Sequence, residues 1–401
     1  MEKHRFSFMD ILKYEKFRQD LHRIPEIGFE EKETKKYLMD YLKSLKIFEK
    51  EIGAKLVEIK ETGFYIDIQG QGERNSEVNT LIAYRTDLDG LPIEEETGVP
   101  YSSTHKGFQH ACGHDGHMTI LTAFLEFYCK NLQKIPSNIT IRFLYQPAEE
   151  GRGGAEMMIE NGCLDNVLEI YGLHNATLFN VGEIGCCSGT IMSRIDTFEI
   201  QIIGRGGHGS TPHLCSNPIQ IGTNIINALH QITSQEIDSK DRCVLTVGNF
   251  TSGSTFNVIP ETGKIQGTVR TITPNTADKI RKRIQEISEG FAKIYNSEVK
   301  VSFTTPGDLT VNYESQTKLV EKVADKYFTL KNNDLPLMAS EDFSFYTKKI
   351  PGCFFILGCG DKDHHRYLHT SYYDFNDKAI PVGVEMYIRI LEENFNLKLL
   401  D

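Results

Sequence analysis

Apolar residues recur every three or four positions in the first part of the chain, a spacing typical of amphipathic helices. Two such helices are predicted within residues 10–45, on either side of the turn-like sequence HRIPEIGFEE. A long apolar stretch at 118–132 predicts a third helix. Strands are predicted where short apolar runs show little alternation, at 63–70, 79–90, 138–151 and 167–175. Such strands, separated by helices, favour a mostly parallel sheet that is buried on both faces.

The pattern changes near residue 193. Strands are predicted at 197–204, 244–250, 263–272 and 298–305, and helices at 218–232 and 276–294. This β-α-β-β-α-β order is that of a ferredoxin-like domain. After residue 305 the earlier αβ pattern resumes, so we predict a two-domain α/β fold. A larger, discontinuous domain (1–192 and 304–401) carries the mostly parallel central sheet, and an inserted ferredoxin-like domain spans 193–303.

Length and charge narrow the class of protein. A chain of 401 residues is expected to hold two domains. The net charge of −11 argues against a nucleic-acid or membrane-surface partner, which would need a basic face. No stretch approaches the roughly 18 apolar residues of a membrane span, and MEKHRFSFMDILKYEKF lacks the apolar core of a secretory signal. The nine cysteines follow no framework spacing, which indicates free thiols and a cytoplasmic location.

The segment QHACGHDGHM at 109–118 concentrates metal-capable side chains. Further candidates follow predicted strands in the larger domain, where α/β sheets place their sites. The resulting set is Cys112, His114, Glu149, Glu150, His174 and His369. Any one of these residues is more often structural than a ligand, but together they indicate a metal site. Thiolate, imidazole and carboxylate suit two borderline divalent ions, which could be zinc, manganese, cobalt or nickel.

The adjacent pair Glu149–Glu150 follows a predicted strand. In an extended segment, neighbouring side chains point to opposite faces, so only one of the two is expected to bind a given metal. The other carboxylate is then available as a general base for an attacking water.

Eight motifs occur in a fixed order along the chain: HACGHDGH, QPAEEG, GLHN, GGHGSTPH, FNVIP, GTVR, SEDFS and LHTSYYDFND. In this order they resemble the M20 metallopeptidase/aminoacylase family. The similarity is to its amidohydrolase branch, which holds hippurate hydrolases, auxin-conjugate (IAA-amino acid) hydrolases and N-acetyldiaminopimelate deacetylases. It extends from LHRIPEIGFEE nearly to the end of the chain.

The resemblance implies a role for each matching residue of the larger, catalytic domain. Glu149 is the expected general base, and Asp87 in AYRTDLDGLP is expected to support the metals. Cys112 is the expected bridging ligand. The ligands of the two-metal centre are expected to be Cys112, His114, Glu150, His174 and His369.

For the inserted domain, the resemblance implies a lid that also forms a homodimer. His208 is expected to reach the active site of the partner subunit and to stabilise the oxyanion there. Asn257 and Arg270 are expected to hold the α-carboxylate of the substrate, and an arginine suits that role because its donors form a fork.

The implied function is metal-dependent hydrolysis of the amide bond of N-acyl-L-amino acids, with an N-acetyl, N-benzoyl or similar group, to a carboxylic acid and a free amino acid. A dipeptidase or carboxypeptidase of the same family is an alternative, and it would need an acidic pocket for the substrate's amine. A non-catalytic binding protein is a second alternative, against which the intact Glu149–Glu150 pair argues. Gln109, Thr86 and Gly90 depart from the usual family residues, and they bear on the choice of substrate.

Overall fold

The computed structural model describes residues 6–400 and divides the chain into two compact units. Unit 1 comprises Met1–Ile191, Val311–Leu335 and Asp342–Asp401, and unit 2 comprises Met192–Thr310 and Pro336–Glu341. The first residues of MEKHRFSFMDILKYEKF, on which the expectation of no secretory signal partly rests, lie outside the described residues. Within residues 6–400, no helix has the length and apolar content that crossing a membrane requires.

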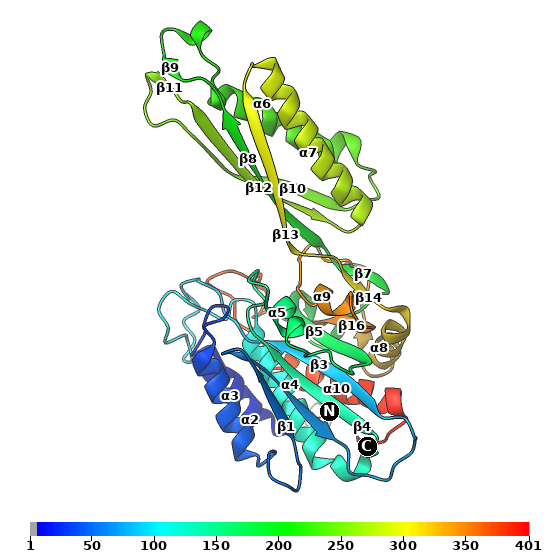
Figure 1. Cartoon of the computed structure of the whole chain (residues 1–401). Helices are drawn as coiled ribbons and strands as arrows, with labels where there is room; N and C mark the ends of the chain where they lie inside the picture. The colour runs from blue at the N-terminus through cyan, green and yellow to red at the C-terminus, as the bar shows by residue number, and fades with distance from the viewer. Residues whose placement is uncertain (1–5, 401) are drawn as a thin grey trace. The chain divides into compact units, whose positions relative to one another are not determined.

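Unit 1 is built on an eight-stranded sheet in the order β1-β2-β4-β3-β5-β16-β6-β15 (Figure 1). The central pairs β4–β3, β3–β5 and β5–β16 are parallel, whereas β1–β2, β2–β4 and β16–β6 are antiparallel. The predicted α/β fold with a mostly parallel central sheet is therefore confirmed. Its strands are β1 (Lys55–Ile59), β2 (Gly63–Gln69), β3 (Thr80–Asp87), β4 (Ile139–Gln146), β5 (Glu169–Asn180), β6 (Glu183–Gly185), β15 (Thr329–Leu330) and β16 (Gly352–Gly360).

Helices cover both faces of this sheet, as the weak alternation of the strands predicted. On β16, Phe354 packs against Phe343 beside α9, while the next residue, Phe355, packs against Tyr387 of α10. Successive strand residues point to opposite faces, so both faces are buried. The helices are α2 (Ile11–His22), α3 (Lys32–Ser44), α4 (His114–Lys130), α5 (Gly154–Glu160), α8 (Glu314–Tyr327), α9 (Ser344–Thr347) and α10 (Ala379–Phe395), with a 3-10 turn, η1, at Leu132–Lys134.

Unit 2 contains a four-stranded antiparallel sheet in the order β10-β12-β8-β13. Two helices pack on one face of it, and their apolar residues Ile221, Ile225, Ile280 and Ile284 join the core of the unit. The elements are β8 (Arg194–Ile203), α6 (Pro218–Gln231), β10 (Cys243–Ser252), β12 (Thr262–Thr271), α7 (Pro274–Ile294) and β13 (Glu298–Gly307). Their order along the chain is β-α-β-β-α-β.

Several short elements have no counterpart in the sequence pattern. A two-stranded ribbon in unit 2 pairs β9 (Gly207–His208) with β11 (Val258–Ile259), and a second ribbon pairs β7 (Gly189–Met192) with β14 (Thr310–Asn312). Unit 2 also holds the short turns η2 (Pro212–Leu214) and η3 (Ile232–Glu236).

Candidate metal centre

The helix α4 begins inside the HACGHDGH motif, at His114, four residues before the predicted start. Gly113 makes this possible, because its left-handed backbone (φ 86°) lets the chain turn directly into the helix. Cys112 and His114 consequently lie on either side of a sharp bend. Both side chains are buried in unit 1.

Replacing Gly113 by Ala is expected to destabilise the protein by roughly 2–5 kcal/mol, from left-handed strain and overpacking together. A Cβ at this position would collide with the side-chain ends of Asn175 and Tyr373. Gly182→Ala is the matched control, because Gly182 has a similar φ of +89° but nothing lies within 4 Å of its Cβ position. Urea denaturation should give a loss of only about 1 kcal/mol for Gly182→Ala. Equal losses would contradict the packed environment of Gly113.

The thiol of Cys112 lies at the middle of the candidate ligands. Its Sγ is 3.3 Å from Nε2 of His174 and 3.3 Å from Nε2 of His369. The same His369 nitrogen lies 3.1 Å from Oε1 of Glu150. Possible ligand atoms of Cys112, His114 and His174 fall within 4.8 Å of one another, as do those of Cys112, Glu150 and His369. The structure thus brings together all five residues expected to bind metal.

The hydrogen bonds of two histidines leave their Nε2 atoms available to a metal. Nδ1 of His114 donates to the carbonyl oxygen of Asp89 at 2.8 Å, and Nδ1 of His174 donates to that of Asn175 at 2.7 Å. A carbonyl only accepts, so the proton of each neutral ring is on Nδ1. Nε2 of His114 is buried and has no hydrogen-bond partner among the described residues.

The charges in the cluster also fit a divalent cation. Burial, followed by the carboxylates of Glu150 and Glu149, raises the pKa of the Cys112 thiol well above its ordinary value. Burial lowers the pKa of His114, but the carboxylates of Asp87 and Asp89 outweigh burial and raise it to about 10. A divalent cation would neutralise the carboxylates, displace the proton from Nε2 of His114 and keep the Cys112 thiol as a thiolate.

Glu149 and Glu150 lie in a turn, so the expectation of an extended segment is wrong. Strand β4 ends at Gln146, and Ala148 has a left-handed φ of 56°. The alternation argument therefore does not apply, and carboxylate oxygens of both glutamates fall within 4.8 Å of a nitrogen of His114. Their other contacts differ, since Glu150 lies beside His369 whereas Glu149 accepts a hydrogen bond from the backbone of Asp342 at 3.4 Å.

Asp87 lies at the end of β3, fully buried, between two histidines. His117, which the sequence analysis did not assign, donates from Nδ1 to Asp87 at 2.8 Å, because its Nε2 accepts the backbone N–H of Asn175 at 3.0 Å. The other carboxylate oxygen of Asp87 accepts from Arg85 at 2.8 Å and faces Nε2 of His114 at 3.8 Å. Asp87 is thus held in place from two sides beside the candidate ligands.

Asn175 is a second residue that the sequence analysis missed, although it lies in the quoted motif GLHN. Its side-chain NH2 donates to the carbonyl of Cys112 at 2.7 Å, and its oxygen accepts from the hydroxyl of Tyr373 at 2.6 Å. These bonds connect β5 to the bend before α4 and to the segment after His369. Asn175 therefore ties together three segments that carry candidate ligands.

A buried ion network supports the start of α4. Asp115, next to His114, accepts from Nδ1 of His22 at 2.7 Å and from Arg18 at 3.4 Å. Burial lowers the pKa of His22, but Asp115 outweighs burial, and with a further bond to Glu95 the pKa rises to about 9.

The free energy of unfolding is therefore expected to depend on pH through His22. Its folded pKa lies above its ordinary value, so its contribution is full below about pH 6.5 and is lost as the pH rises through about 9. His22→Asn should destabilise the protein on the order of 3 kcal/mol more at pH 6 than at pH 10. Denaturant titrations of both proteins at the two pH values measure this difference. A pH-independent effect would show that His22 is not charged in the folded protein.

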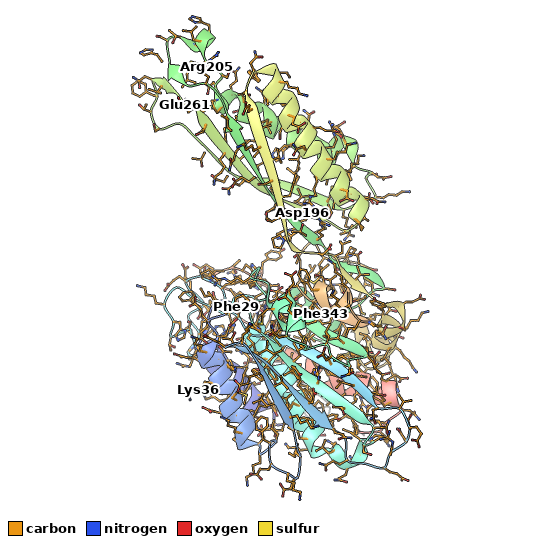
Figure 2. All side chains as sticks on the ribbon, in the orientation of Figure 1. Phe29, Lys36, Asp196, Arg205, Glu261 and Phe343 are labelled. Atoms are coloured by element: carbon orange, nitrogen blue, oxygen red, sulfur yellow. The ribbon has the colours of Figure 1, made fainter. Side chains whose placement is uncertain are left out.

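Within unit 2, two of the three expected site residues lie together. His208 pairs with Val258 in the β9–β11 ribbon, and the carbonyl of Asn257 accepts the N–H of Gly209 at 2.9 Å. Both His208 and Asn257 are exposed. Arg205 and Glu261, which are labelled in Figure 2, lie at this same end of the unit.

Arg270 lies toward the other end of unit 2. It pairs with Ile195 of β8. The next residue of that strand, Asp196, is labelled in Figure 2 at the end of the unit opposite the β9–β11 ribbon. The ten-residue strand β12 spans about 30 Å between these ends. Burial lowers the pKa of Arg270, which is half-buried.

Residues 83–393 match the family model for peptidase family M20/M25/M40. The chain belongs to this family. It is 35% identical to an N-acetyldiaminopimelate deacetylase of Ligilactobacillus salivarius, over 95% of this chain and 97% of that protein. It is 36% identical to an N-acetyl-L-cysteine deacetylase of Bacillus subtilis, over 96% of this chain and 89% of that protein.

Solved structures of the family agree with the fold. A putative aminohydrolase from methicillin-resistant Staphylococcus aureus superposes with a TM-score of 0.84 at 27% identity, over 98% of this chain and 100% of that one. A dinuclear metal-binding peptidase of the M20 family from Bacillus subtilis superposes with a TM-score of 0.80 at 26% identity, over 97% and 99% of the two chains. The family resemblance expected from the eight motifs is confirmed.

Proposed function

We propose that this M20 hydrolase cleaves the amide bond of N-acyl-L-amino acids by means of two divalent metal ions. The observation that carries the proposal is the convergence of Cys112, His114, Glu150, His174 and His369 around one thiol, with the Nε2 atoms of His114 and His174 left available. The names of the two deacetylase relatives support an N-acyl amino acid as the substrate.

Two divalent ions held by these five residues would supply Lewis acidity and lower the pKa of water. Glu149 is proposed as the general base, which takes a proton from the attacking water and passes it to the leaving amine nitrogen. Asp87 is held by its bonds to His117 and Arg85, and it is proposed to support the ligand cluster through His114, whose Nε2 lies 3.8 Å from its carboxylate. Glu149 itself is oriented by the backbone of Asp342.

Unit 2 is proposed to bind the substrate, with His208 stabilising the oxyanion and with Asn257 and Arg270 holding the α-carboxylate. Asn257 and Arg270 lie toward opposite ends of a unit whose strand β12 alone spans about 30 Å. A small substrate cannot reach both in the same copy of the unit. We therefore propose a homodimer in which the two residues come from different subunits.

The test is a substrate panel with metal-reconstituted protein, comprising N-acetyl and N-benzoyl amino acids, their α-amides and dipeptides. Hydrolysis of N-acyl amino acids, with weak turnover of the α-amides, is the expected result, because an amide cannot replace the carboxylate opposite Arg270. Hydrolysis of dipeptides alone would favour the peptidase alternative. A metal-loaded protein that cleaves none of these substrates would contradict the proposal.

A further inference from the structure

Three consecutive backbone N–H groups in the Glu149–Glu150 turn point at two buried carboxylates. Glu31 accepts the N–H of Ala148 at 2.8 Å. Asp89 accepts the N–H of Glu149 on Oδ1 at 3.1 Å and the N–H of Glu150 on Oδ2 at 3.0 Å. Successive N–H groups on a turn form a concave anion-binding site, and here the protein fills that site with its own carboxylates.

Asp89 is also bonded to His114. Its carbonyl oxygen accepts from Nδ1 of His114 at 2.8 Å, and its Oδ1 lies 3.3 Å from the same nitrogen. Asp89 is 1% exposed, so water does not compete for these bonds. One residue therefore contacts the proposed general base and two of the proposed ligands.

We propose that Asp89 is a positioning residue that sets the places of Glu149 and Glu150 relative to His114, with Glu31 supporting the turn from Ala148. This inference rests on the proposed function, which gives those three residues their roles. Hydrogen bonds to a charged acceptor are about twice as strong as neutral ones, and buried N–H groups that lose their partner are costly. The carboxylate of Asp89 thus favours one arrangement of the turn over its alternatives.

The conservative variant Asp89→Asn tests whether the carboxylate of Asp89 positions the turn, or whether the volume of the side chain is sufficient. Asparagine keeps the size of the side chain, but it has one acceptor oxygen, and its NH2 group would face a backbone N–H. One of the two bonds to the Glu149–Glu150 turn is therefore lost. A misplacement of about 1 Å in a catalytic group is enough to lower a rate 10²-fold.

The first readout is the affinity for Mn²⁺ alone, measured by calorimetric titration, which needs no substrate. Asp89→Asn is expected to weaken Mn²⁺ binding by 10- to 100-fold, the usual effect of losing a residue that orients metal ligands. In assays at saturating Mn²⁺, kcat should fall at least tenfold while KM changes less than threefold, because the proposed carboxylate-binding residues of unit 2 are untouched.

Glu126→Gln is the matched control. Glu126 is another buried carboxylate of unit 1, and it binds Lys13, Tyr14 and Tyr41 near the far end of α4. This variant should lower the Tm and leave both Mn²⁺ affinity and kcat unchanged. An Asp89→Asn protein that behaves in the same way would overturn the proposal.

Asp89→Glu decides the question if Asp89→Asn does not fold. Glutamate retains the charge but adds a methylene group in a buried site, which displaces the carboxylate that binds the N–H groups of Glu149 and Glu150, so Mn²⁺ should bind more weakly, and unchanged affinity would overturn the proposal. Failure of the proposed substrate is recognisable separately. Wild-type protein that binds Mn²⁺ and hydrolyses no N-acyl amino acid would exclude that substrate, while the titrations would still test the role of Asp89.

Discussion

Glu149→Gln is expected to lower kcat for an N-acyl amino acid by 10²- to 10⁴-fold, the usual contribution of a general base. Glutamine keeps the size of the side chain and removes the basic oxygen. Metal content should stay at two ions per subunit, because Glu150 is the carboxylate that lies beside His369 at 3.1 Å and belongs to the group around Cys112.

The neighbouring variant Glu150→Gln provides the comparison. It should lose bound metal as well as activity, so the two adjacent substitutions differ in metal content and not only in rate. Both quantities are measured on the same preparations, by steady-state kinetics and by elemental analysis. Wild-type kcat in Glu149→Gln would assign the base elsewhere, and loss of metal from that variant would make Glu149 a ligand.

Cys112→Ala is expected to remove at least one metal ion per subunit. It should lower activity by more than the 10- to 100-fold that is usual when a residue hydrogen-bonded to a metal ligand is lost. The thiol is the common neighbour of His174 and His369, at 3.3 Å from each, so its removal disconnects the two groups of candidate ligands.

Cys163→Ala is the control for loss of a buried thiol. Cys163 is fully buried in the same unit but belongs to none of the possible metal-binding groups among residues 6–400. It should bind two metal ions and keep its activity, with a modest loss of stability. Full metal content in Cys112→Ala would contradict the proposal that Cys112 is a metal ligand.

Much of unit 1 could be predicted because apolar periodicity reports burial directly. The helices at 10–45, the buried strands and the mostly parallel sheet all follow from it. The start of α4 could not be predicted from apolar periodicity, because the first four residues of the helix are polar or glycine. Strand β5 also continues past His174 to Asn180, because β16 pairs alongside it.

The turn at Glu149–Glu150 shows a different limit of sequence reasoning. Its shape depends on Asp89 and Glu31, which lie 60 and 117 residues away from the N–H groups that they bind. No local pattern carries such contacts. Asp89 and Asn175 could nevertheless have been identified from the sequence, because Asp89 lies in the motif RTDLDG and Asn175 in GLHN. A polar residue beside a candidate ligand in such a motif is a candidate for holding that ligand.

The most direct measurement is the return of activity to chelator-treated protein as Zn²⁺ or Mn²⁺ is added in known equivalents. Hydrolysis of an N-acetyl amino acid should be absent after chelation and should rise to a plateau at two equivalents per subunit. Full activity in protein that retains no metal would contradict the assignment of the Cys112 cluster as a two-metal centre.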